Sequence, residues 1–249
     1  MLNIAIMRDG RMGSLIRQTA EAMRDANQNP VFNVSAQIGF DLEQARTAPA
    51  ADVLIDFSNV ATLPAVEAYA KRCGCALVSG TTGYSADEME RLRALGDSVA
   101  VLHSGNYSIG VAALRHLTAQ ATRELPGFDV EICETHHNQK VDAPSGTANL
   151  LLDAVVDAQA AAGRGDYSPV FGRFGMCGAR DPHEIGMHSL RGGTVAGVHT
   201  VSFFGPDEEV TLTHRAGSRQ IFVNGALAAA LKMAARQPGF YTFDQVMFD

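Results

Sequence analysis

The sequence of 249 residues has no long apolar run, no basic block and no motif that needs a metal. No stretch reaches the ~20 apolar residues that a membrane-spanning helix needs, so we expect no membrane partner. The formal net charge is −7, with no basic cluster to offset it, which argues against a nucleic-acid partner. Any anionic ligand must therefore be held by a local group of donors.

Cysteine is scarce, and its spacing excludes the common redox and zinc motifs. Cys73 and Cys75 are separated by one intervening residue, whereas those motifs have two, and no second pair follows them. We therefore expect reduced, mostly buried thiols. The segment 1–6 looks like a first strand and lacks the basic region and small-residue cleavage site of a signal peptide, so we expect a cytoplasmic protein.

The first hundred residues alternate short apolar runs with helix-period segments. We expect strands near 2–7, 31–36, 52–57, 76–79 and 99–103, with helices between them that include 63–69 and 86–95. Such strand–helix repeats favour an α/β fold with a doubly wound, Rossmann-like parallel sheet.

The rhythm changes after Asn106. Helices are expected over 111–125 and 147–161, and strands over 130–135, 185–190, 194–199, 200–204 and 209–214. A closing helix is expected over 220–235. We predict a dinucleotide-binding domain of residues 1–107, joined by the C-terminal segment 218–249, and a smaller α+β substrate domain of residues 108–217 with an antiparallel or mixed sheet.

A glycine loop follows the first expected strand. Gly10 and Gly13 fit the second and third glycines of the dinucleotide fingerprint, whereas Met7 occupies the first position. Backbone N–H groups there could meet a pyrophosphate, with Arg8 or Arg11 adding charge; an ordinary turn with surface arginines is the alternative. No acid lies at the tip of the second strand, since Asp41 falls beyond it. The loop therefore predicts a dinucleotide without selecting NADH or NADPH.

Two further expected strand ends carry polar loops, Gly80-Thr81-Thr82-Gly83 and Ser104-Gly105-Asn106-Tyr107-Ser108. Ligands of α/β sheets bind beyond the carboxyl ends of the strands, so these loops could hold ribose or carboxamide groups. They could equally be bare turns.

The densest chemistry lies at residues 134–148. Asp142-Ala143-Pro144 should break regular structure, so that Ser145 caps a helix whose first turn holds Gly146 and Thr147. Such a helix start binds carboxylates. His136, His137 and Lys140 lie just upstream and could supply a proton and positive charge.

This segment admits three other interpretations. Two surface-loop histidines with a solvated lysine and a capped helix need no function at all. A metal site on Cys133, Glu134, His136 and His137 is disfavoured because the H-E-x-x-H spacing is absent, and we expect no metal. A serine hydrolase is disfavoured because Ser145 lacks the G-x-S-x-G elbow.

The segment Glu134-Thr135-His136-His137-Asn138-Gln139-Lys140-Val141-Asp142-Ala143-Pro144-Ser145-Gly146-Thr147-Ala148 resembles the signature E-x-H-H-x-x-K-x-D-A-P-S-G-T-A of the dihydrodipicolinate reductase family. The resemblance covers most of the chain. Supporting segments are residues 10–13, 80–83, 106–111, 185–193 and 214–219.

The resemblance implies NADH- or NADPH-dependent reduction of 4-hydroxy-tetrahydrodipicolinate, a cyclic imine with two carboxylates, in diaminopimelate and lysine biosynthesis. It implies that His136 is the proton donor and Lys140 a second donor. The substrate carboxylates would be held by His137, Lys140, Ser145, Gly146, Thr147 and, more weakly, Arg219. The cofactor would be held by Met7, Arg8, Asp9, Gly10, Arg11, Met12, Gly13, Gly80, Thr81, Thr82, Ser104, Gly105, Asn106 and Tyr107. It also implies an open sheet that builds a homotetramer, and domains that close over the ligands.

The chain departs from the family pattern at Met7, which replaces a glycine, at the missing ribose-binding acid, and at Tyr107, where phenylalanine is usual. One rival hypothesis is a nucleotide-sensing Rossmann protein without catalysis, which Met7 favours and the intact His136–Lys140 set disfavours. The other is a reductase that acts on a different carboxylated imine or aldehyde.

Overall fold

The computed structural model describes residues 1–7, 10–39 and 41–249, which form two compact units. The first unit comprises Met1–Ser108 together with Gln220–Asp249, and the second comprises Ile109–Arg219. Within the described residues no helix has the length and apolar content needed to cross a membrane.

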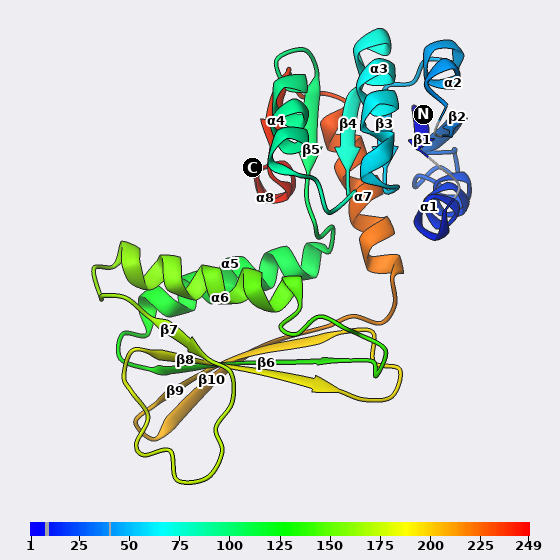
Figure 1. The fold of residues 1–249 in the computed structure, drawn as a ribbon. Coiled ribbons are helices and arrows are strands. Elements are labelled where there is room, and N and C mark those ends of the chain that lie inside the picture. Colours follow the sequence, from blue (N-terminus) through cyan, green and yellow to red (C-terminus); the bar gives the residue numbers. More distant parts are fainter. Residues whose placement is uncertain (8–9, 40) are drawn as a thin grey trace. The chain divides into compact units, whose positions relative to one another are not determined.

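The first unit is built on a six-stranded parallel sheet (Figure 1). The sequence predicts a parallel sheet and five of these strands, but not the one at Gly239–Tyr241. Its strands are β1 (Leu2–Met7), β2 (Phe32–Ile38), β3 (Val53–Asp56), β4 (Ala76–Ser79), β5 (Ala100–His103) and β11 (Gly239–Tyr241), in the spatial order β11-β5-β4-β3-β1-β2. β3 and β4 are buried throughout, as expected for a sheet covered on both faces. The chain reverses its direction across the sheet beside β1, which is where such sheets bind ligands.

Helices cover this sheet, and their ends carry the usual signals. They are α1 (Arg11–Ala22), α2 (Leu42–Thr47), α3 (Leu63–Cys73), α4 (Ala86–Leu95), α7 (Gln220–Met233) and α8 (Phe243–Phe248), with a 3₁₀ turn, η1 (Val60–Thr62). Ser85 and Glu88 form a capping box at the start of α4. Gly74 ends α3 in the left-handed conformation, with φ of 61°.

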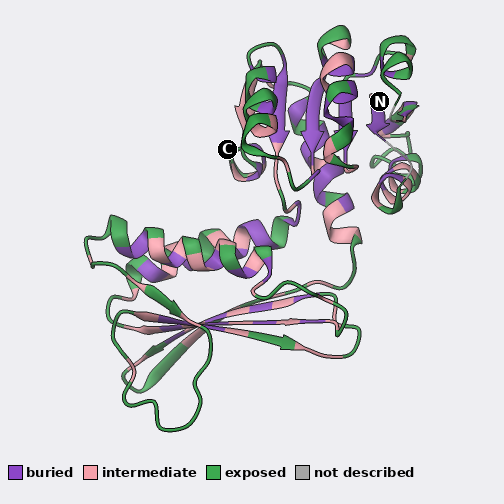
Figure 2. Ribbon diagram, in the orientation of Figure 1, coloured by how far each residue is buried: buried purple, intermediate pink, exposed green. Residues whose placement is uncertain are grey.

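The second unit is a five-stranded mixed sheet with two helices on one face (Figure 1). The strands are β6 (Asp129–His136), β7 (Ser168–Val170), β8 (Glu184–Arg191), β9 (Val198–Gly205) and β10 (Glu208–Arg215), in the order β10-β9-β6-β8-β7. The helices are α5 (Ile109–Glu124) and α6 (Gly146–Ala161). Buried residues alternate with more exposed ones along β6 and β9, because only one face of this sheet packs on the helices (Figure 2).

One expected strand is wrong. Residues 194–199 do not form a strand of their own, because 194–197 is an irregular connection and β9 begins at Val198. Gly193 and Gly197 have φ of 52° and 155°, values that break strand geometry. The β-branched residues between these glycines gave a strand-like pattern, but the flanking backbone turns the chain back toward β6. That turn places His199 at the beginning of β9.

Candidate active site

The site begins in the side-chain alternation of β6. Val130, Ile132, Glu134 and His136 are all buried and lie on the same face of the strand, whereas the residues between them are only partly buried. The first two belong to the hydrophobic core of this unit, while Glu134 and His136 extend the same row to the carboxyl end of the strand. An acid and a histidine therefore close one end of an apolar core.

The neighbouring strands change from apolar to polar at the same level. On β8, Met187 belongs to the core, and Ser189 and Arg191 continue its face; on β9, Val201 belongs to the core and His199 continues its face. In the sheet register Glu134 lies between Ser189 and His199, and His136 lies beside Arg191. The register thus brings five polar side chains from three strands into one cluster.

Glu134 is the best-connected member of this cluster. Its Oε1 accepts hydrogen bonds from the Ser145 backbone N–H at 3.1 Å, Ser189 Oγ at 2.7 Å and Arg191 Nη2 at 2.9 Å. Burial raises the pKa of the Glu134 carboxyl, but these hydrogen bonds outweigh it and hold the pKa below its usual value. Glu134 is therefore a buried carboxylate with one oxygen fully used.

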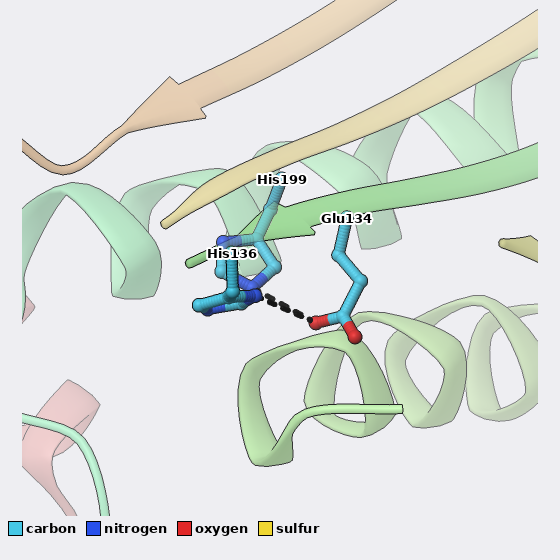
Figure 3. Close-up of side chains that lie close together, drawn as sticks. All are labelled: Glu134, His136 and His199. Carbon is cyan, nitrogen blue, oxygen red and sulfur yellow. Dashed lines mark ion pairs between the residues drawn. The ribbon is translucent and has the colours of Figure 1, made fainter. Parts of the chain in front are cut away.

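The other oxygen of Glu134 faces two histidine rings (Figure 3). Oε2 lies 3.4 Å from His136 Nδ1 and 3.7 Å from His199 Nε2. The rings meet edge to face, with centroids 5.1 Å apart. Burial lowers the pKa of His136 below its ordinary value; Glu134 opposes this shift, while nearby cations add to it. Burial and His136 together lower the pKa of His199 to about 4, so that ring is neutral at pH 7.

The loop after β6 carries the remaining expected donors. Lys140 Nζ pairs with both carboxylate oxygens of Asp142, at 2.8 and 2.9 Å, and the hydrogen bond lowers the pKa of Asp142. His137 Nδ1 accepts a hydrogen bond from the Gln139 N–H at 3.2 Å. That bond leaves the proton of a neutral His137 on Nε2, where it can be donated to an anion.

The start of α6 has the form of an anion site. Ser145 is the N-cap, and its Oγ accepts from the Ala148 N–H at 3.2 Å and lies 3.1 Å from His199 Nε2. Ser145 is only 3% exposed and both its groups are used inside the protein, whereas Gly146 in the first turn is exposed and Thr147 is partly exposed. A Cβ placed on Gly146 would meet no atom within 4 Å, so the fold itself does not require glycine there. Open space at a helix N-terminus suits a carboxylate.

Two further observations concern the expected ligands, and both expectations stay predictions. Arg219 is exposed at the end of the second unit and makes no hydrogen bond or ion pair within the described part of the chain. Glu134, His136 and His199 offer ligand-type atoms within 4.8 Å of one another and could hold a divalent cation, a set that the sequence spacing did not indicate. A cation there would have to compete with Arg191 for Glu134 and with Ser145 for His199.

The other expected site lies in the first unit. The loops after β1, β3, β4 and β5 all leave the same edge of the parallel sheet, and three of them carry the expected cofactor residues. Gly10 caps α1 with φ of −79°, and a Cβ there would meet nothing within 4 Å. Glycine at this position is therefore not needed for folding and leaves room for a pyrophosphate at the start of α1. Arg11, Met12 and Gly13 form the first turn of α1, whereas Arg8 and Asp9 lie outside the described residues.

Several expected cofactor residues turn their side chains inward. Met7 is 1% exposed and belongs to the hydrophobic core of the unit, so only its backbone could approach a nucleotide. The Tyr107 hydroxyl donates to the Ser79 carbonyl at 2.8 Å, and the Thr81 hydroxyl donates to Asp56 at 2.8 Å. Thr82 and Gly105 are exposed, and Ser104 and Asn106 are partly so. The loop surface consists of backbone and small side chains, as a dinucleotide site needs.

Family models cover nearly the whole chain. Residues 2–107 match the model described as "Dihydrodipicolinate reductase, N-terminus", and residues 110–247 match "Dihydrodipicolinate reductase, C-terminus". The chain belongs to the dihydrodipicolinate reductase family. The family named from the signature segment is thereby confirmed.

Individual relatives agree with this family. The chain is 38% identical over 250 residues to a 4-hydroxy-tetrahydrodipicolinate reductase of an Exiguobacterium species, with 98% of this chain and 95% of the relative covered. It is 41% identical over 242 residues to the protein of the same name from Akkermansia muciniphila, with 96% and 94% covered. The solved dipicolinate-bound dihydrodipicolinate reductase from Paenisporosarcina sp. TG-14 shares the fold, with a TM-score of 0.76, 22% identity and complete coverage of both chains.

Sequence reasoning about this dihydrodipicolinate reductase family member missed the partners of His136. From the sequence, Glu134 is only a possible metal ligand and the first residue of the family signature, and His199, Ser189 and Arg191 are not among the expected site residues. The only signal was that Ser189 and Arg191 lie in one of the segments that resemble the family. His199 had no signal, because its closeness to Glu134 comes from the pairing of β9 with β6.

Proposed function

We propose that this protein reduces 4-hydroxy-tetrahydrodipicolinate to tetrahydrodipicolinate with a nicotinamide dinucleotide. The observation that carries the proposal is a buried histidine, His136, held by a carboxylate next to an open helix start that suits an anion. The two relatives named above are both called 4-hydroxy-tetrahydrodipicolinate reductase, and the match spans nearly their whole length, which fits the same reaction. Net, one hydride and one proton are consumed and the hydroxyl leaves as water.

The substrate is a dicarboxylate, and the second unit offers two kinds of anion contact. One is the first turn of α6, which begins at the exposed Gly146 and where the helix dipole favours negative charge. The other is the pair of donors His137 and Lys140 in the preceding loop. Lys140 pairs with Asp142 in this structure, so it must leave that carboxylate to bind a carboxylate of the substrate. The free-energy cost of this exchange is small, because the ion pair is partly exposed.

His136 is the proposed proton donor. The pKa of His136 lies below its ordinary value because burial disfavours the imidazolium, so the ring gives up its proton readily. Lys140 offsets the negative charge that develops on the ring of the substrate. In the first unit, backbone groups near Gly10 and the polar loops at residues 80–82 and 104–107 hold the dinucleotide. When bound, the reduced nicotinamide supplies the hydride.

We further propose that NADH and NADPH are both used. Asp41, the nearest acid to the tip of β2, caps α2 and accepts from the Glu43 N–H at 2.9 Å. A carboxylate engaged in a helix cap is not placed to repel the 2′-phosphate of NADPH or to grip the ribose of NADH. Catalytic efficiencies with the two cofactors should therefore lie within about tenfold of each other, or about 1.4 kcal/mol.

The homotetramer and the cytoplasmic location also stay predictions. The face of the second sheet that points away from α5 and α6 carries Leu190 and Phe204, which are 49% and 41% exposed. Phe174 and Met176, in the loop after β7, are fully exposed. Large exposed apolar side chains mark surfaces that associate, which supports assembly through this sheet. Light scattering on the purified protein tests the tetramer, and a monomer would refute it.

One coupled assay tests the reaction. The substrate is generated from pyruvate and aspartate semialdehyde by its synthase, and oxidation of NADH or NADPH is followed by absorbance. We expect both to be oxidised only when all components are present. Nucleotide binding without oxidation would refute the reductase and favour the sensing protein. Oxidation with other carboxylated imines at higher efficiency would favour a different substrate.

A further inference from the structure

We propose that Glu134 is a positioning residue that fixes His136 with its proton on Nδ1 and leaves Nε2 to transfer the catalytic proton, while His199 locks this arrangement. The inference rests on the proposed function, because it assigns roles around the proton donor of that reaction. It is carried by the geometry of three buried side chains (Figure 3).

The second oxygen of Glu134 needs a hydrogen-bond donor. Oε2 is buried and makes no hydrogen bond of good geometry to any described residue, although the group is a carboxylate. A buried carboxylate oxygen requires a donor. His136 Nδ1 and His199 Nε2 face it at 3.4 and 3.7 Å. The arrangement that satisfies the oxygen carries a proton on each of these two nitrogens.

With Nδ1 facing Glu134, Nε2 is the nitrogen of His136 that remains for proton transfer. With its proton on Nδ1, a neutral His136 presents a lone pair at Nε2, and the imidazolium presents an N–H there. Gly197 leaves the space beside this nitrogen: a Cβ at residue 197 would lie 3.1 Å from Nε2. The proton that is transferred and replaced is thus the one on Nε2, while the Nδ1 proton stays with Glu134.

His199 supplies rigidity without adding charge. Its ring lies edge to face against His136, and its Nε2 is within 3.1 Å of Ser145 Oγ at the start of α6. Burial and His136 lower the pKa of His199 to about 4, so at neutral pH it does not compete with His136 for the negative charge of Glu134. Across the sheet, His199 lies beside His214, whose pKa burial also lowers.

The charged groups that act on His136 lie on β6, in the loop that follows it and on β8. Glu134 on β6 favours the imidazolium, whereas Lys140 and His137 in the next loop and Arg191 on β8 disfavour it. Glu134 is therefore the one group among these that raises the pKa of His136. Its removal should lower that pKa by about one unit or more, the usual effect of an opposite charge at this distance.

The test has an arm that needs no catalysis and an arm that does. In protein labelled with ¹⁵N, long-range ¹H–¹⁵N spectra report which ring nitrogen of His136 carries the proton, together with its pKa. We expect Nδ1–H in the wild type, and in Glu134→Gln a mixed tautomer and a pKa lower by about one unit or more. Nε2–H in the wild type would overturn the proposal, and this observation requires no variant.

The second arm is the pH profile of kcat/KM. Activity that depends on the His136 imidazolium falls as pH rises through its pKa, so in Glu134→Gln the falling limb should move to lower pH by the same shift. Ser189→Ala is the matched control, because it removes one hydrogen bond to Glu134 but keeps the charge, and it should leave the limb in place. An unmoved limb in folded Glu134→Gln would overturn the positioning role. Absence of turnover in the wild type would refute the proposed function alone, since the spectra still decide the tautomer.

Discussion

Met7 offers the sharpest test, because sequence and structure assign it different roles. In the glycine fingerprint, Met7 occupies a position where glycine is expected. If the Met7 side chain loosens the phosphate loop, Met7→Gly should tighten nucleotide binding. In the structure Met7 ends β1, is 1% exposed and belongs to the core that includes Ile38 and Leu54. We therefore expect Met7→Gly to destabilise the first unit and to leave nucleotide affinity no better.

The magnitude follows from two contributions. Truncating a buried methionine to alanine costs about 2–5 kcal/mol, from lost transfer free energy and the cavity left behind. Glycine in a strand costs roughly a further 0.5–1 kcal/mol in backbone entropy. A total near 4 kcal/mol is a large share of the usual stability of a domain, which is about 5–15 kcal/mol. With a urea m-value of about 2 kcal/mol/M, the unfolding midpoint should fall by about 2 M.

The assay combines urea unfolding, followed by circular dichroism, with nucleotide titration below the transition. Met7→Leu is the matched control, because a volume-conserving change in a core usually costs less than about 1.5 kcal/mol. If Met7→Gly unfolds at the wild-type urea concentration and binds nucleotide more tightly, the side chain lies in the loop and the core assignment is refuted.

Four further predictions test the two sites. Gly10→Ala should change stability by no more than about 1 kcal/mol, yet weaken NADH binding at least about tenfold in a titration; unchanged affinity would refute the pyrophosphate site. Gly146→Ala should raise KM for the dicarboxylate about tenfold without affecting nucleotide affinity, and a loss of both would point to misfolding. Asp142→Asn should lower KM by up to about fivefold, because it frees Lys140 from an ion pair worth about 0.2–1 kcal/mol, whereas a rise would show that Asp142 supports binding. Folding lowers the pKa of His199 from 6.5 to about 4, so as pH falls the histidine is protonated in the unfolded chain before it is protonated in the folded one. The free energy of unfolding should therefore be unaffected by this group above pH 6.5 and should decrease between pH 6.5 and 4, by roughly 3 kcal/mol in all. Equilibrium unfolding at pH 7.5 and 4.5 should show a smaller drop in His199→Gln, and an equal drop would refute the linkage.

Much of the fold could be read from the sequence because its local signals agree with one another. The expected helix over 86–95 coincides with α4, and the expected helices over 111–125 and 147–161 differ from α5 and α6 by one or two residues at their ends. Apolar spacing indicates all three helices, and Ser85 and Ser145 cap α4 and α6. The prediction of a strand over 194–199 was wrong because it gave more weight to the β-branched residues Thr194 and Val195 than to Gly193 and Gly197. Those glycines decide the backbone there.

The sequence by itself determined the α/β class, the family, and a short segment that carries His136, Lys140 and the start of α6. These are local properties: a histidine is two residues from Glu134, and a helix start is nine residues further on, whatever the rest of the chain does. Only the tertiary structure decided which groups act on His136. Strand register places His199 and Arg191, both more than fifty residues away in the chain, beside the same carboxylate. Spacing along a chain carries no information about such pairing, because register is fixed by the whole apolar face that the three strands bury together.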